Sequence, residues 1–305
     1  MSPPRARPFQ QVDVFSAELL RGNPLAVVLD GEGLSAAQMQ AFAAWTQLSE
    51  TTFVLPPTPE ARAQGADYRV RIFTPGGELP FAGHPTLGTA HAWLAAGHRP
   101  QTAGQVVQEC GVGLVHLRQQ EGRRAFAAPA LRRSAVAPET LAAVCEALGL
   151  AQDEVQAAQW LDNGPRWLGL WLPDVDSVLS LEPDHARLKA LGTKVGVAAP
   201  RALAGGLIRR ASREARAFAT HADSTDIEVR AFAAPVGIAE DPVTGSLQAS
   251  LAQWLIAEGR LPPRYRARQG TRLGRAGEVF VAQDDRGQVW VGGDVAEGVT
   301  GQVRL

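Results

Sequence analysis

Two stretches of this chain are similar enough to be copies of one ancestral domain. The first copy contains VRIFTPGGELPFAGHP and the second contains VRAFAAPVGIAEDPVTGS, and a helix-like segment follows each of them. Phe232 follows Phe73 by 159 positions, whereas Trp254 follows Trp93 by 161, so the loops differ in length by two residues. Two copies this far apart are too few and too long for a solenoid. The repeat therefore predicts two like halves that face each other across a cleft.

Composition limits the classes of protein to which the chain can belong. Its 305 residues are 45% hydrophobic and 20% charged, which is typical of a soluble, enzyme-sized protein with about two domains. The net charge of −1 and the lack of a basic stripe argue against nucleic acid as a partner. The chain starts without the apolar run of a signal peptide and has no apolar segment long enough to span a membrane. We therefore expect a cytoplasmic protein with no membrane partner.

Strands outnumber helices in the predicted secondary structure. Helices are expected at 35–48, at 138–148 and after each repeated loop, where Gly97 and Gly259 are the expected stops. Strands are expected at 11–15, 25–29, 51–55, 68–73, 105–108, 112–118, 124–127, 166–172, 207–211, 216–220, 227–233, 278–282, 289–292 and 302–305. So few helices cannot connect so many parallel strands. The prediction is an α+β fold with two pseudo-symmetric, mostly antiparallel curved sheets, each around one central helix.

The predicted halves are an N-terminal domain over 1–130 and a C-terminal domain over 131–305. The Pro-containing segment 129–138 is the expected linker between them. The last strand is placed so that it can return to the N-terminal half.

Neither cysteine nor histidine spacing indicates a metal site. Cys110 and Cys145 have no CxxC neighbour, so we expect two buried, reduced thiols. His84, His91 and His98 recur every seven residues, whereas paired metal ligands on a helix usually lie four residues apart. We expect no metal.

The two repeated loops end in helix starts that suit an anion. Gly83 and His84 open the first helix, and Gly245 and Ser246 open the second, where a constant offset of 161 aligns His84 with Gly245. A helix start offers unpaired backbone N–H groups and a positive dipole end, so it can hold a carboxylate. The dipole contributes only about 0.3–1 kcal/mol, which orients a ligand rather than drives its binding. We expect a small-molecule carboxylate at Gly83 and Gly245.

Groups able to move protons lie around these helix starts. They are Glu50, His84, Asp241 and Ser246, with Glu78 and Glu240 nearby as surface or supporting charges. The chain has no G-x-S-x-G elbow, phosphate loop or dinucleotide fingerprint, which favours acid–base chemistry without a cofactor. A carboxyl that works at neutral pH needs a raised pKa, and the apolar neighbours of Glu50 favour its burial.

Each of these residues also has an ordinary structural interpretation. Glu50 alone is more often a solvated residue at a helix end, because glutamate is seldom buried. Asp241 and Ser246 suit helix capping or a turn as well as they suit function. His84 can be a packed histidine.

Ordered motifs over nearly the whole chain carry a family resemblance. These are QQVDVFS and GNPLAVV, LSETTFV, RIFTPGGELPFAGHPTLGTAHAWL, GIAEDPVTGSLQASLAQW, QGTRLGRAGEV and VWVGG. The chain resembles the PhzF family, relatives of the phenazine-biosynthesis isomerase that share the diaminopimelate epimerase-like fold. The resemblance implies two similar β-rich halves, a site between them and a homodimer.

The resemblance also implies a role for each candidate residue. In the phenazine enzyme, the glutamate of the SET motif shuttles a proton during isomerisation of a dihydro-hydroxyanthranilate, and Glu50 matches that glutamate. His84, Asp241 and Ser246 match the GHP, EDP and TGS motifs, which implies that they bind or polarise the substrate and assist proton transfer. The expected function is a cofactor-independent isomerase that acts by general acid–base catalysis on a small, cyclic carboxylate.

Two alternatives remain open. One is a non-catalytic protein that binds small molecules in the same cleft. The other is an amino-acid racemase or epimerase with one cysteine at each helix start. Cys110 and Cys145 lie far along the chain from both helix starts, which speaks against the second alternative.

Overall fold

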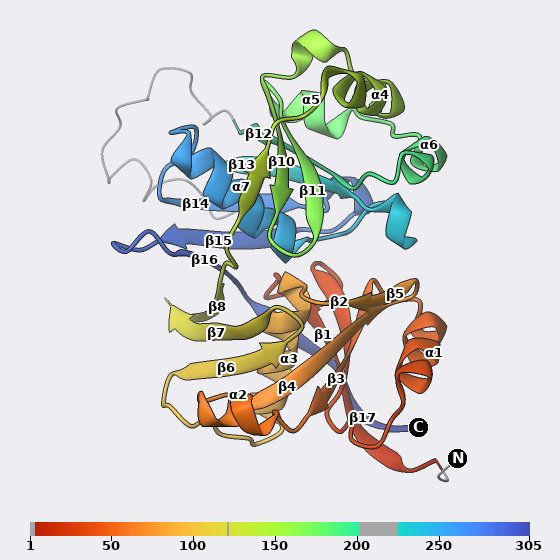
Figure 1. The fold of residues 1–305 in the computed structure, drawn as a ribbon, viewed down its shortest axis with the longest axis vertical. Coiled ribbons are helices and arrows are strands. Elements are labelled where there is room, and N and C mark those ends of the chain that lie inside the picture. The colour runs from red at the N-terminus through yellow and green to blue at the C-terminus, as the bar shows by residue number, and fades with distance from the viewer. Residues whose placement is uncertain (1–3, 121, 202–224) are drawn as a thin grey trace.

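The computed structural model describes residues 4–120, 122–201 and 225–305 and divides into two similar halves (Figure 1). The strands of the first half are β1 (Ala6–Val14), β2 (Asn23–Val28), β3 (Glu50–Leu55), β4 (Tyr68–Thr74), β5 (Gly77–Leu79), β6 (Gln105–Cys110), β7 (Gly113–Gln120) and β8 (Arg123–Ala127). Its helices are α1 (Ala36–Thr46), α2 (Pro59–Ala63) and α3 (Gly83–Ala95).

The second half repeats the order of the first. Its strands are β9 (Arg132–Ser134), β10 (Ala157–Asp162), β11 (Arg166–Trp171), β12 (Val195–Pro200), β13 (Ile227–Phe232), β14 (Arg264–Gln269), β15 (Gly277–Gln283) and β16 (Val289–Gly293). Its helices are α4 (Pro138–Leu148), α5 (Val175–Leu179), α6 (His185–Ala190) and α7 (Gly245–Ala257). The last strand, β17 (Val295–Arg304), leaves the second half and pairs with β1 in the first (Figure 1).

Neighbouring strands form a continuous hydrogen-bonded path through both halves. The order in the first half is β17, β1, β2, β3, β4, β6, β7 and β8. Strand β8 pairs with β16, and the path continues through β15, β14, β13, β12, β11, β10 and β9. The parallel pairs are β2–β3 and β4–β6 in the first half and β11–β12 and β13–β14 in the second. Because most pairs are antiparallel, the predicted fold class is confirmed.

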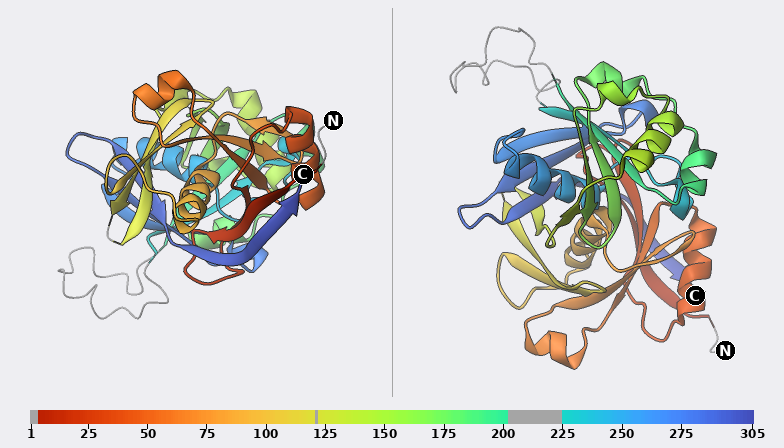
Figure 2. Two further views of the ribbon diagram at one scale, coloured as in Figure 1. Left: turned by 90° about the horizontal axis from the view of Figure 1, so that it is seen from below. Right: turned by 45° about the horizontal axis from the view of Figure 1, so that its top comes forward.

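The central helices α3 and α7 fill the curves of the two sheets. Helix α3 contacts β1, β2, β3, β6 and β8, and it lies within these strands in the left view of Figure 2. Helix α7 contacts β10, β15 and β16. Most residues of both helices are buried, since small and apolar side chains occupy all their faces. At Gly88 a Cβ atom would lie 2.6 Å from Leu25 Cδ2, so only glycine lets α3 pack this closely against the sheet.

The local sequence signals for α1 act as predicted. Ser35 and Gln38 form a capping box at its start. Its last residue is Thr46, two residues before the predicted end, and the next residue, Gln47, has a left-handed backbone with φ +57°. Glu50, which the sequence places between a helix ending at 48 and a strand starting at 51, is the first residue of β3.

Several predicted elements differ from the structure. The segment 129–138 is not a plain linker, because it contains β9, which pairs with β10. Strand β17 is longer than the predicted 302–305, since it pairs along the whole of β1. Strands β10, β12 and β14 were not predicted, and the arginines of β14 (RYRARQ) conceal its alternation of buried residues. The strands predicted at 207–211 and 216–220 lie outside the described residues.

The two thiols differ in their environments. Cys145 is buried in the core of the second half, as predicted. Cys110 is only half-buried, with Sγ 3.6 Å from the Gly113 carbonyl, so full burial was the wrong prediction for it. Both thiols are free, and burial raises the pKa of each. Within the described residues, no helix is both long and apolar enough to cross a membrane.

Candidate active site

The two halves meet where α3 and α7 begin. A Cβ atom placed on Gly83 would lie 2.6 Å from the Gly245 carbonyl carbon, and one on Gly245 would lie 2.8 Å from Gly83 Cα. The two helix starts therefore touch through backbone alone, which only glycine at both positions allows. Their first-turn N–H groups, which have no partner inside the helices, gather at one place.

The helix bounds correct the alignment of the two copies. Both helices begin at a glycine, and each is followed by a left-handed glycine, Gly97 with φ +91° and Gly259 with φ +68°. The offset between equivalent residues is therefore 162 along the helices, one more than the tryptophan match indicated. His84 is accordingly the counterpart of Ser246 and not of Gly245.

All four predicted acid–base residues lie at this junction and are buried. The exposed fractions are 7% for Glu50, 2% for His84, 5% for Asp241 and 3% for Ser246. The Glu50 Oε2 and His84 Nε2 atoms are 3.5 Å apart, and neither has a hydrogen-bond partner among the described residues. A small shift or a bound ligand is enough to make a proton path between them, because catalytic contacts often tighten only in the complex.

Asn23, the first residue of β2, connects His84 to Asp241. Its Nδ2 group donates to Asp241 Oδ1 at 2.7 Å and to the Val243 carbonyl at 2.9 Å, and it lies 3.3 Å from His84 Nδ1. The Ser49 hydroxyl in turn donates to Asn23 Oδ1 at 3.0 Å. One fully buried amide thus holds groups from both halves together.

Asp241 is also fixed from within the second half. The Thr244 hydroxyl donates to its Oδ2 at 2.5 Å, and Gln269 Nε2 donates to its backbone carbonyl at 3.0 Å. Gln269 Oε1 accepts from the Thr244 N–H and from Gln248 Nε2. These hydrogen bonds hold the Asp241 carboxylate in a single orientation.

Burial gives Glu50 the properties of a neutral-pH acid or base. Loss of hydration raises the pKa of Glu50 to about 8, the negative charge of Asp241 adds to this, and Ser49 and Lys194 oppose it. A carboxyl with its pKa in this range can both take and give a proton near neutral pH.

Burial shifts the pKa values of two neighbours of Glu50 in opposite directions. Burial lowers the pKa of His84 to about 3, so the imidazole is neutral near pH 7. Burial also raises the pKa of Asp241 to about 6, against hydrogen bonds from Thr244 and Asn23 that favour its ionised form. The site therefore combines a proton-holding carboxyl with a neutral imidazole.

Ser246 is held in place through its backbone. Its carbonyl accepts a hydrogen bond from Asn163 Nδ2 at 2.9 Å, and among the described residues its hydroxyl makes no hydrogen bond. Glu78 and Glu240 lie outside the site, where they pair with Arg71 and Arg230.

The three histidines that recur every seven residues have different surroundings. His84 lies in the site, whereas His91 contacts Glu297 of β17 at 3.0 Å, and the His98 ring stacks on Trp93 with centroids 5.0 Å apart. Among the described residues, no group of three or more His, Cys, Asp or Glu side chains is arranged to hold a metal ion.

Sequence reasoning missed several residues of the site. Asn23, which lies between the predicted strands at 11–15 and 25–29, was given no role, and neither were Ser49, Asn163 and Lys194. Asn23 lies in the GNP motif and Ser49 in the SET motif, so the motifs marked the segments but not these side chains.

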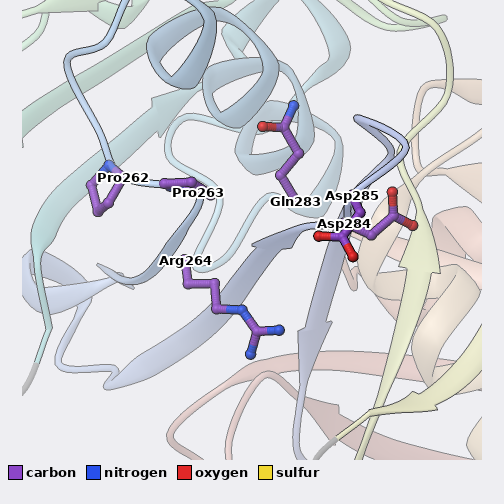
Figure 3. Close-up of a pocket in the computed structure, with 6 residues that line it drawn as sticks. All are labelled: Pro262, Pro263, Arg264, Gln283, Asp284 and Asp285. Carbon is purple, nitrogen blue, oxygen red and sulfur yellow. The ribbon is translucent and has the colours of Figure 1, made fainter.

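Two surface hollows lie away from the candidate site. One of about 430 Å³ is formed by the start of β14 and the turn after β15 (Figure 3). Another of about 480 Å³ lies beside β4 and β6. Neither includes Glu50, His84 or Asp241, whose side chains are buried at the junction of the two halves.

Comparisons with known proteins identify the family of this chain. The family model for PhzC-PhzF, described as phenazine biosynthesis-like protein, matches residues 12–300. The trans-2,3-dihydro-3-hydroxyanthranilate isomerase of Pseudomonas fluorescens is 32% identical over 282 residues, covering 91% of this chain and 90% of the relative. Antisense-enhancing sequence 1 of Schizosaccharomyces pombe is 32% identical over 311 residues, covering 96% and 97%.

Solved structures show the same fold. A PhzF-family phenazine biosynthesis protein from Bacillus anthracis superposes with a TM-score of 0.78 at 20% identity, covering 99% of this chain and 100% of that one. Structures of a hydroxyproline epimerase and of a probable proline racemase share the fold at lower similarity. The chain therefore belongs to the PhzC-PhzF family of phenazine biosynthesis-like proteins and is an isomerase of that family.

Proposed function

We propose that the protein is a cofactor-independent isomerase that uses Glu50 as a general acid and base on a small, cyclic, carboxylate-bearing substrate. The proposed reaction is similar to that of trans-2,3-dihydro-3-hydroxyanthranilate isomerase, the name carried by a relative that matches 91% of the chain. His84, Asp241 and Ser246 are proposed to bind the substrate and assist proton transfer.

One observation carries this proposal. The Glu50 carboxyl is almost fully buried, its pKa is raised to about 8, and its Oε2 atom has no hydrogen-bond partner while it faces a neutral imidazole. A buried carboxyl oxygen without a hydrogen-bond partner is costly to keep, so a purely structural role is a poor explanation for it.

The proposed reaction moves one proton and leaves the substrate formula unchanged. Ionised Glu50 removes a proton from one carbon, and the released electron pair shifts along the adjacent double bond. The resulting carboxylic acid returns the proton to the carbon at the far end of that system. The neutral imidazole of His84 forms a hydrogen bond with a substrate oxygen. The N–H groups at Gly83 and Gly245 hold the substrate carboxylate.

Solvent exchange tests the proposal. The protein is incubated in D₂O with trans-2,3-dihydro-3-hydroxyanthranilate, and deuterium in the product is measured by mass spectrometry. We expect incorporation by the wild type and a loss of roughly 10²–10⁴-fold in rate in Glu50→Gln. Glu60→Gln, an exposed position in the first turn of α2, is the matched control.

The same experiment separates the alternatives. Tight binding of the compound with no exchange would favour a non-catalytic binding protein. Exchange at the α-carbon of an amino acid such as proline, without a shift of a double bond, would favour a racemase or epimerase.

We also propose that the protein is a homodimer, as the family resemblance implies, and that it is located in the cytoplasm. Light scattering of the purified chain tests the oligomeric state, and fractionation of the source cells tests the location. A monomer at micromolar concentration would contradict the first part of this proposal.

A further inference from the structure

Lys194 occupies in the second half the place that Glu50 occupies in the first. Phe73 of β4 pairs with Thr51 of β3, and its repeat partner Phe232 of β13 pairs with Val195 of β12. The residue before Thr51 is Glu50, and the residue before Val195 is Lys194. The halves are related by a pseudo-twofold axis, so the ammonium group of Lys194 occupies in the second half the position that the Glu50 carboxyl occupies in the first.

Strand alternation directs both side chains to the central helices. Thr52, two residues after Glu50, accepts a hydrogen bond from Thr89 of α3 at 2.9 Å. A Cβ atom on Gly196, two residues after Lys194, would lie 2.3 Å from Leu247 Cδ1 of α7. Since residues two apart share one face of a strand, Glu50 is directed toward α3 and Lys194 toward α7.

The Lys194 ammonium group has no anionic partner in contact. It is half-buried, lies 4.9 Å from the centroid of the Trp167 ring, and forms no ion pair with any described residue. Glu50 and Asp162 act on it only at longer range, and burial lowers the pKa of Lys194 to about 8. A half-buried cation beside an aromatic ring has lost part of its hydration without an anion to replace it, which points to a missing anion.

The surroundings of Lys194 also lack hydrogen-bond partners. Asn163 is 3% exposed, and although its Nδ2 atom donates to Ser246, its Oδ1 atom has no partner among the described residues. Trp167 is 3% exposed as well, and its Nε1 donor has no partner there. Buried polar atoms are normally paired, so this wall of the site has the features of a binding surface.

We propose that Lys194 is a specificity-determining residue that binds a second anionic group of the substrate, across the site from Glu50. This proposal rests on the proposed function. Within the proposed class of small carboxylates, it favours acids that carry another negatively charged group over those with a single carboxylate, such as trans-2,3-dihydro-3-hydroxyanthranilate. The Trp167 ring packs beside that group.

Binding of stable aromatic acids tests the proposal without turnover. Isothermal titration calorimetry compares benzoate, with one carboxylate, to phthalate and isophthalate, with two. We expect the wild type to bind at least one dicarboxylate about tenfold or more tightly than benzoate, as a charge-assisted hydrogen bond provides. Lys194→Met should lose this preference and keep benzoate binding, and Lys194→Arg should retain much of the preference.

Controls separate this inference from general damage and from the proposed function. Lys189, the other lysine of the chain, is exposed on α6, so Lys189→Met should behave as wild type. If Lys194→Met does not fold, Lys194→Gln replaces it. Glu50→Gln should keep the dicarboxylate preference even though it abolishes exchange. Equal affinities for all three acids in the wild type, no binding of any of them, or an unchanged preference in Lys194→Met would overturn the proposal.

Discussion

Asn23 of the first half donates a hydrogen bond to Asp241 of the second at 2.7 Å, although 218 residues separate them in the chain. The same Nδ2 group reaches the Val243 carbonyl and approaches His84. This amide fixes the relative position of the two halves at the point where the candidate acid–base groups meet.

Replacement of Asn23 should therefore affect both stability and activity. Asn23→Ala leaves buried acceptors of Asp241 and Val243 unpaired, so we expect a loss of about 2–4 kcal/mol in the free energy of unfolding. Isomerase activity should fall with it, as His84 and Asp241 lose their common partner. Urea denaturation measures the first effect. Ser49→Ala removes a donor to Asn23 and a group that lowers the pKa of Glu50, and it should cost clearly less. Equal losses would contradict the central role of Asn23.

The contact of the helix starts gives a second prediction. In Gly83→Ala the new methyl group would lie 2.6 Å from the Gly245 backbone, so the halves must move apart. We expect activity to drop at least about tenfold with a lower thermal midpoint, because displacements near 1 Å strongly affect catalysis. Gly301→Ala, where nothing lies within 4 Å of the added Cβ, is the control. A crystal structure of the Gly83→Ala variant with unmoved helix starts would refute this explanation.

Glu50 gives a prediction about pH and stability. Its pKa is about 8 in the folded protein and near 4.5 when unfolded, so the folded state holds the proton more tightly. Stability from this group is then lost as pH rises from 4.5 through 8. Glu50→Gln removes this loss, and we expect its melting temperature to exceed that of the wild type at pH 9, by on the order of 5 °C, but not at pH 4.5. Calorimetric scans at the two pH values measure the difference, and parallel wild-type and variant curves would show that Glu50 is not buried in solution.

Two ion pairs occupy corresponding positions in the two halves, so the effects of breaking them on stability can be compared. Arg230 and Glu240 pair with side-chain exposures of 4% and 8%, whereas Arg71 and Glu78 pair with exposures of 27% and 42%. Arg230 also donates to two backbone carbonyls from the segment around α5. We expect Arg230→Met to destabilise the fold by about 3–5 kcal/mol, since it leaves a buried charge unpaired. Arg71→Met should cost about 1 kcal/mol or less. Chemical denaturation of both variants tests the contrast, which similar losses would contradict.

The sequence determined much of the architecture because repetition and local patterns are encoded along the chain. The repeated strand, loop and helix predicted two halves, and the Ser35 capping box marked the start of α1. Strands with ordinary alternation were predicted, whereas β14 was missed because its exposed arginines conceal the buried face. The offset of 161 was one residue short along the helices, because matching tryptophans do not mark equivalent helix positions.

The candidate site was determined only in part by sequence. Sequence motifs identified Glu50, His84 and Asp241 as candidates. The burial of these residues and the distances between them depend on how β3, α3 and the loop before α7 pack together. Asn23 and Lys194 carry no local signal, because an amide or an ammonium acquires its role from partners far away in the chain. The sequence thus determined which segments form each half. The packing of the two halves against each other determined which side chains are buried, which pKa values are shifted and which groups face one another.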